Sequence, residues 1–192
     1  PETEEKVELT KFEITNTSDK AQTITSTVAI PMYARSASNI RDHRHVTSLL
    51  HRTFTVKNGI MIYPTLTFDE RGHNKNKIFY GALAKEEVNG EMVSPVSFCP
   101  VTEEFIGRGG NFENPYYVVK NQPLPYKAGE EVDGYETVAA IRFADCTLEP
   151  GETRTYIVAL GYGESEAEIT ELSKKYLIKK HFDKYLEETK EF

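Results

Sequence analysis

The feature that most constrains the fold is a period-two alternation of apolar and polar side chains, which runs through most of the chain. It is clearest between Thr53 and Tyr63, where two alternating arms flank Asn58 and Gly59. A period of two places successive side chains on opposite faces of a strand, and Asn-Gly is typical of a two-residue type I′ turn. This segment therefore predicts a β-hairpin with Asn58-Gly59 at its tip.

Val7–Ile14, with one slip that a bulge would give, and Gln22–Tyr33 carry the same alternation and predict two more strands. Further strand candidates are Lys77–Leu83, Tyr116–Lys120, Tyr135–Phe143 and Arg154–Gly161. We expect the first two to pair as a hairpin across the turn residues Asn16–Asp19. Leu148–Glu152 has Pro and then Gly where a type II turn prefers them. About eight short strands separated by turns predict a mainly β fold, an antiparallel β-sandwich.

The period changes near the C-terminal end. Ser165 and Glu168 have the spacing of a capping box, and apolar residues from Ile169 to Leu186 then recur every three or four positions. This pattern predicts one amphipathic helix of about 26 residues. It reaches Phe192 without a Gly or Pro stop signal, so we expect a piece of a longer polypeptide. Residues 1–163 would be a sandwich domain, incomplete at its N-terminus, and residues 164–192 a linker helix toward a missing catalytic domain.

Composition excludes several classes of protein. With 39% hydrophobic residues, 11 Tyr and 10 Phe, the chain is too apolar and aromatic for a disordered protein. It has no apolar run near the roughly 20 residues that a membrane helix needs, so we expect no membrane partner. A net charge of −7 argues against general nucleic-acid binding. Two widely spaced cysteines favour reduced thiols and a cytoplasmic protein.

One cationic segment stands out in this acidic chain, and we call residues 35–52 the Arg/His block. Its candidate binding residues are Arg35, Asn39, Arg41, Asp42, His43, Arg44, His45, His51 and Arg52. Guanidinium and amide groups offer forked donors to hydroxyls, carboxylates or phosphates, and histidine adds pH-sensitive donors. The block is therefore a polar ligand site or an interface loop, or a loop held by ion pairs with Asp42, Asp69 and Glu70. These interpretations do not exclude one another.

The histidines of the block also raise the question of a metal. His43 and His45 would share one face of a strand, but the neighbouring arginines would repel a cation. We therefore expect no metal and no cofactor. A second loop, Phe105–Phe112, is rich in glycine but lacks the Lys-Ser/Thr ending of a phosphate-binding loop. We expect it to project Arg108 and Asn111. Nothing in the sequence forms a nucleophile–base–orienter set, so we assign no catalytic residue.

Several motifs together resemble a known family. Phe12-Glu-Ile-Thr-Asn-Thr-Ser-Asp19 before a strand, and Leu148-x-Pro-Gly-Glu152 before Tyr156-Ile-Val-Ala-Leu-Gly161, resemble the N-terminal sandwich of cellobiose-phosphorylase-type glycoside phosphorylases, glycoside hydrolase family 94. The Arg/His block is most similar to the branch that acts on 1,2-β-oligoglucans. The resemblance spans nearly the whole chain, although each strand or turn motif is common by itself.

The resemblance implies a fold and a reaction. The fold would be a galactose-mutarotase-like supersandwich followed by a linker helix and an (α/α)6 barrel. The enzymes are inverting phosphorylases, in which inorganic phosphate as co-substrate converts a β-glucan oligosaccharide or disaccharide to α-glucose 1-phosphate. Their general acid and phosphate site belong to the barrel, and no residue of this chain matches them. The sandwich would contribute to a homodimer interface and to the substrate cleft.

Two other interpretations remain open on the sequence alone. The chain could be a stand-alone carbohydrate-binding module, for which the absence of Trp is unfavourable although 11 Tyr remain. It could instead be a structural interaction domain, in which the Arg/His block contacts another subunit.

Overall fold

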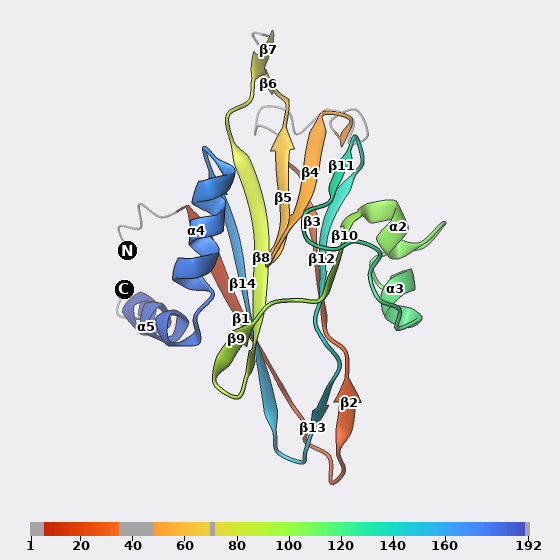
Figure 1. The fold of residues 1–192 in the computed structure, drawn as a ribbon, viewed down its shortest axis with the longest axis vertical. Helices are drawn as coiled ribbons and strands as arrows, with labels where there is room; N and C mark the ends of the chain where they lie inside the picture. The colour runs from red at the N-terminus through yellow and green to blue at the C-terminus, as the bar shows by residue number, and fades with distance from the viewer. Residues whose placement is uncertain (1–5, 35–47, 70–71, 191–192) are drawn as a thin grey trace.

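The computed structural model describes residues 6–34, 48–69 and 72–190 and shows two antiparallel sheets packed face to face (Figure 1). The larger sheet has the strand order β1-β14-β8-β5-β4-β11, with β9 added beside β8. The smaller sheet has the order β10-β12-β3, and two ribbons, β13-β2 and β6-β7, extend from the sandwich. The prediction of a mainly β antiparallel sandwich is confirmed.

The bounds of the elements are as follows. The strands are β1 (Val7–Thr15), β2 (Gln22–Ile24), β3 (Thr27–Met32), β4 (His51–Val56), β5 (Gly59–Pro64), β6 (Leu66–Asp69), β7 (Gly72–Lys75), β8 (Phe79–Val88), β9 (Glu91–Val93), β10 (Ser97–Val101), β11 (Glu131–Asp133), β12 (Thr137–Arg142), β13 (Cys146–Leu148) and β14 (Thr153–Gly163). The helices are α2 (Thr102–Ile106), α3 (Tyr116–Val119), α4 (Glu166–Tyr176) and α5 (Lys179–Lys190).

Successive side chains of a strand point to opposite faces of its sheet, and in the central strands β5 and β12 nearly all of them are buried, so each sheet has two buried faces. Between the sheets, Ile60, Ala82 and Val158 of the larger sheet pack in one cluster with Phe98 and Ile141 of the smaller one. Burying this apolar surface is the main source of stability of the sandwich. The remaining faces are covered by helices, α4 and α5 on the larger sheet and α2 and α3 on the smaller one, on opposite sides of the sandwich (Figure 1).

The pairing of the first strands differs from the prediction. β1 pairs with β14 in unbroken register from Val7 opposite Gly161 to Thr15 opposite Thr153, so the predicted bulge and the hairpin with the next strand are wrong. The next two strands pair with β13 and β12 instead. The chain leaves the larger sheet after β1 ends at Thr15, and Asn16 stabilises the turn that follows. The Asn16 side-chain amide donates 2.8 Å hydrogen bonds to the carbonyls of Lys20 and Leu148.

The predicted β4–β5 hairpin is confirmed, but its turn is placed one residue earlier. Val56 pairs with Gly59, so Lys57 and Asn58 form the tip and neither has a positive φ. Gly59 is required for space, because a Cβ there would lie 2.0 Å from the carbonyl oxygen of Ala82. The turn between β8 and β9 has the positive φ values of type I′, 53° at Asn89 and 85° at Gly90.

Two predicted elements differ in kind. Tyr116–Lys120 is not a strand, because Tyr116–Val119 form the short helix α3 after Pro115. The predicted long C-terminal helix is interrupted after Tyr176. Ile169 of α4, Leu177 of the connection and Phe182 of α5 all pack on the larger sheet. The five-residue gap from Leu177 to Phe182 departs from helical spacing, so one straight helix could not bury both.

Two local predictions at turns and caps are confirmed. Ser165 accepts a hydrogen bond from the Glu168 N–H at 3.2 Å, and the Glu168 carboxylate accepts one from the Glu164 N–H at 2.9 Å. In the turn before β14, Gly151 has φ 81° and the Glu152 N–H donates to the Glu149 carbonyl at 2.9 Å, as in a type II turn. In the described part of the chain, no helix is long and apolar enough to cross a membrane.

Candidate functional site

Most of the Arg/His block lies outside the described residues. Seven of its candidate residues lie outside the described residues: Arg35, Asn39, Arg41, Asp42, His43, Arg44 and His45. His51 and Arg52, at the start of β4, are described and behave very differently from each other.

His51 is a buried side chain. It is 3% exposed, and neither ring nitrogen closes a hydrogen bond. Burial lowers the pKa of His51 below its ordinary value of 6.5, and the nearby backbone oxygens of Ala34 and Tyr135 offset only part of this shift. The imidazole is therefore neutral near pH 7 and does not add a positive charge to the block.

Arg52 points toward the neighbouring strand. Its Nε lies 3.4 Å from the Asp133 carboxylate on β11, and its side chain remains 43% exposed. Its Nη1 donates to the His51 carbonyl at 3.0 Å. Arg52 is thus held in place while still offering donors to a ligand or a neighbouring surface.

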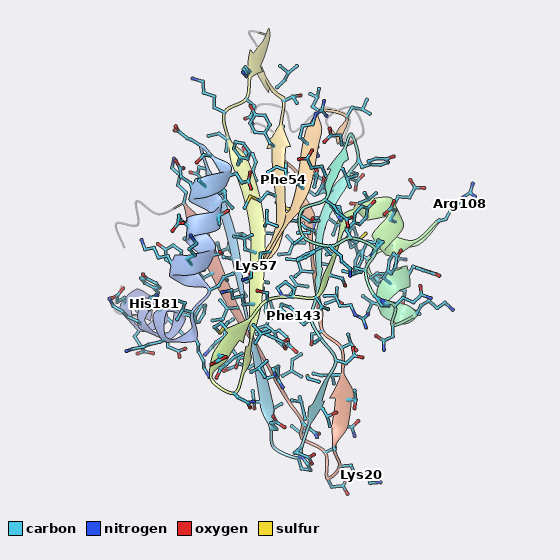
Figure 2. The ribbon with its side chains drawn as sticks, viewed as in Figure 1. Lys20, Phe54, Lys57, Arg108, Phe143 and His181 are labelled. Carbon is cyan, nitrogen blue, oxygen red and sulfur yellow. The ribbon has the colours of Figure 1, made fainter. Side chains whose placement is uncertain are left out.

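The second predicted loop follows α2 on the outer face of the smaller sheet. Arg108 is exposed and points away from the domain (Figure 2). Asn111 is also exposed, and its Oδ1 accepts 3.0 Å hydrogen bonds from the N–H groups of Glu113 and Asn114. Arg108 is therefore free to meet a ligand, whereas the Asn111 oxygen shapes the loop.

Arg108 borders an open groove of about 580 Å³ that sequence reasoning missed. Its chemically active lining is Glu103, Glu104, Arg108, Tyr116, Tyr117 and Tyr135, and we call it the tyrosine groove. No spacing pattern links these residues, because they come from α2, the following loop, α3 and the segment after β11. The Pro115-Tyr116-Tyr117 sequence was the one local signal for them.

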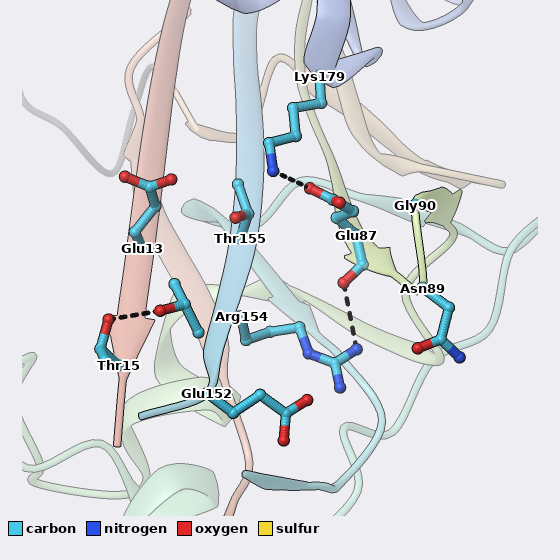
Figure 3. Close-up of a pocket in the computed structure, with 10 residues that line it drawn as sticks. Glu13, Thr15, Glu87, Asn89, Gly90, Glu152, Arg154, Thr155 and Lys179 are labelled. Carbon is cyan, nitrogen blue, oxygen red and sulfur yellow. Dashed lines mark hydrogen bonds and ion pairs between the residues drawn. The ribbon is translucent and has the colours of Figure 1, made fainter. Parts of the chain in front are cut away.

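A second hollow, of about 400 Å³, lies on the larger sheet and is bordered by Lys179 of α5 (Figure 3). Glu13, Thr155 and Glu87 line its floor at matching positions on three adjacent strands. Lys179 lies 2.7 Å from the Glu87 carboxylate, and Arg154 donates to the Glu87 carbonyl at 3.2 Å. Both bordering cations are thus already engaged with protein groups.

The described residues give no indication of metal or thiol chemistry. Among them, no group of three or more His, Cys, Asp or Glu side chains could hold a metal ion. Cys99 and Cys146 are free cysteines. Burial raises the pKa of Cys99 to about 12, so this thiol is a poor nucleophile at neutral pH.

Comparison with known proteins places this architecture in a family. The family model described as glycosyl hydrolase 94, supersandwich domain, matches residues 2–178. No curated protein matches the chain significantly. The match covers most of the chain, including both strand-and-turn motifs and the two-sheet core described above. The chain therefore belongs to the glycosyl hydrolase 94 family, as its supersandwich domain.

Proposed function

We propose that this chain is the non-catalytic N-terminal sandwich portion of an inverting glycoside phosphorylase that acts on a β-glucan oligosaccharide or disaccharide. The observation that carries the proposal is the family match over residues 2–178. The exposed polar and aromatic side chains around Arg52 and the tyrosine groove support a role in contacts rather than in bond cleavage.

In the proposed reaction, an oxygen of inorganic phosphate attacks the anomeric carbon of a β-glucoside. The bond to the leaving sugar breaks, and a general acid gives that sugar oxygen a proton. Attack from the opposite face converts the β-linkage into α-glucose 1-phosphate. We assign the general acid and the phosphate site to an (α/α)6 barrel elsewhere in the polypeptide, in a cytoplasmic enzyme, consistent with the free thiols of Cys99 and Cys146.

The sandwich would contribute to a homodimer interface and to the substrate cleft. We assign this contact to the Arg/His block, because its arginines and amide can bind sugar hydroxyls, phosphate or carboxylates of a neighbouring subunit. Arg52 supports this assignment, since its guanidinium is held by Asp133 and remains partly exposed.

Phosphorolysis by the gene product that carries this chain tests the proposal. The purified protein is incubated with sophoro-oligosaccharides or cellobiose, with and without inorganic phosphate, and glucose 1-phosphate is measured with a coupled dehydrogenase. We expect phosphate-dependent release from one substrate series and none from the 192-residue chain alone. The absence of release from both series would contradict the proposal.

Alanine substitution of Arg41 and Arg44 in the same gene product tests the assigned contact. A change in oligomer size together with a raised KM for the sugar is expected if the block serves both the interface and the cleft. A change in oligomer size with an unchanged KM would show that the Arg/His block contacts another subunit and would contradict its role in the substrate cleft.

A further inference from the structure

The tyrosine groove is built on the segment that connects β10 to β11 and contains α2 and α3. Phe105 of α2 is fully buried and packs with Cys99, Leu124 and Val138 on the outer face of the smaller sheet. This anchor fixes α2, and the turn at Asn111 leads the chain back toward α3. The groove is therefore supported by core packing and not by loop residues alone.

Two of its aromatic rings are presented to solvent. Tyr116 is 43% exposed and Tyr135 is 53% exposed, although they come from segments far apart in the sequence. Tyr117 is partly buried, and its ring lies 5.4 Å from that of Tyr116 in an edge-to-face arrangement. An isolated exposed aromatic is ordinary, but two exposed rings beside one groove of this size are typical of a binding surface.

Polar groups of both kinds border these rings. The exposed carboxylates of Glu103 and Glu104 are acceptors, and the Arg108 guanidinium is a forked donor. Tyr126 donates to Glu104 at 3.3 Å, which leaves the second Glu104 oxygen for a ligand. Two carboxylates and one guanidinium give the groove a net negative charge, which disfavours phosphates and nucleic acids.

A pyranose has the complementary chemistry. The ring of a β-linked glucose has apolar C–H faces that pack on aromatic rings, and its equatorial hydroxyls both donate and accept hydrogen bonds. Carboxylates accept from neighbouring hydroxyls, while guanidinium and phenol groups donate to hydroxyl oxygens.

We propose that the tyrosine groove binds a short segment of a β-linked glucan, with sugar rings stacked on Tyr116 and Tyr135 and hydroxyls bound by Glu103, Glu104 and Arg108. The choice of glucose as the sugar rests on the proposed function. The groove geometry itself supports a neutral, hydroxyl-rich chain.

Calorimetric titration of the 192-residue chain tests this binding, with cellotetraose, the β-1,2-linked tetraose and the α-linked maltotetraose as separate ligands. We expect saturable binding of at least one β-linked tetraose and markedly weaker binding of maltotetraose. Tyr116→Ala and Tyr135→Ala should each weaken binding about five- to ten-fold, the effect of one lost aromatic contact, while Tyr116→Phe keeps the ring and most of the affinity.

Tyr162→Ala is the matched control, because Tyr162 is also 43% exposed but does not line the groove. It should leave binding unchanged, and circular dichroism should show that every variant is folded. Equal loss in Tyr116→Ala and Tyr162→Ala, or no binding of either β-linked tetraose by the folded chain, would overturn the proposal. A change in oligomer size in Tyr116→Ala without any sugar binding would instead identify the groove as a subunit contact.

The two proposals fail separately. Sugar binding by this chain without phosphorolysis by the gene product would leave the groove standing and contradict the phosphorylase assignment. Phosphorolysis by the gene product without sugar binding by this chain would support the phosphorylase assignment and contradict the groove proposal.

Discussion

Replacement of Gly59 by alanine should destabilise the domain far more than replacement of Gly90. At Gly59 an added Cβ would lie 2.0 Å from the Ala82 oxygen and 2.8 Å from the Leu83 Cα, both in the backbone of β8. Ordinary carbon–oxygen contacts are near 3.3 Å, so β5 and β8 must separate by roughly 1 Å. That separation strains the ladder at the 2.7 Å hydrogen bond from the Ala84 N–H to the Asn58 carbonyl.

The expected cost follows from these contacts. Overpacking costs about 1–3 kcal/mol, and a weakened buried hydrogen bond adds about 1 kcal/mol. The substitution also reduces the conformational freedom of the unfolded chain, which offsets about 0.4–1 kcal/mol of this cost, so the net destabilisation is about 2 kcal/mol. At Gly90, with φ 85° and nothing within 4 Å of an added Cβ, only backbone strain acts. That strain costs about 1–2 kcal/mol before the same offset.

Equilibrium unfolding in urea, followed by far-UV circular dichroism, measures both free energies. Gly59→Ala should lose about 1.5 kcal/mol more stability than Gly90→Ala. Gly90→Asn should be nearly neutral, because Asn tolerates a positive φ. A cost for Gly90→Ala equal to or above that for Gly59→Ala would refute the reasoning, since it would mean that steric contact with β8 does not dominate.

Three other substitutions test buried polar groups. His51→Leu should flatten the pH dependence of stability. Because the pKa of His51 is lower in the folded than in the unfolded chain, its contribution to the free energy of unfolding is present above the ordinary pKa of 6.5 and is lost as the pH falls. Urea midpoints at pH 7.5 and 5.5 measure this difference. Arg154→Met should cost about 3 kcal/mol at pH 7, because it leaves the buried Glu86 carboxylate without the cation 3.8 Å away. The cost should shrink at pH 4, since burial raises the pKa of Glu86 and the protonated acid needs no counterion; equal costs at both pH values would contradict this. Asn16→Ala should cost about 2 kcal/mol in thermal or urea unfolding, because it leaves the buried Leu148 carbonyl unpaired, whereas the exposed neighbour substitution Thr17→Ala should cost little.

The strands were predictable where short apolar runs rich in β-branched residues are buried, as in β5, β12 and β14. Their partners were not, because β1 pairs with β14 across more than a hundred intervening residues and nothing local encodes that choice. Tyr116–Val119 was mistaken for a strand because a short apolar run with two valines has no periodicity that separates strand from helix.

The site was predictable only in part. Composition and spacing indicated the Arg/His block and Arg108 as candidates. The structure shows that Arg52 is held by Asp133 and that Arg108 is exposed. It also shows that His51 belongs to the buried interior, which spacing alone does not reveal. The tyrosine groove could not be predicted, because its residues meet only after the smaller sheet brings α2, α3 and the segment after β11 together.

The most direct test of the phosphorylase assignment is the anomeric configuration of the product, followed by proton NMR while the gene product acts on a β-linked glucose oligosaccharide. The account predicts an α-anomeric glucose 1-phosphate signal that grows only when inorganic phosphate is present. Free glucose formed at the same rate without phosphate, or a β-configured phosphate ester, would contradict it.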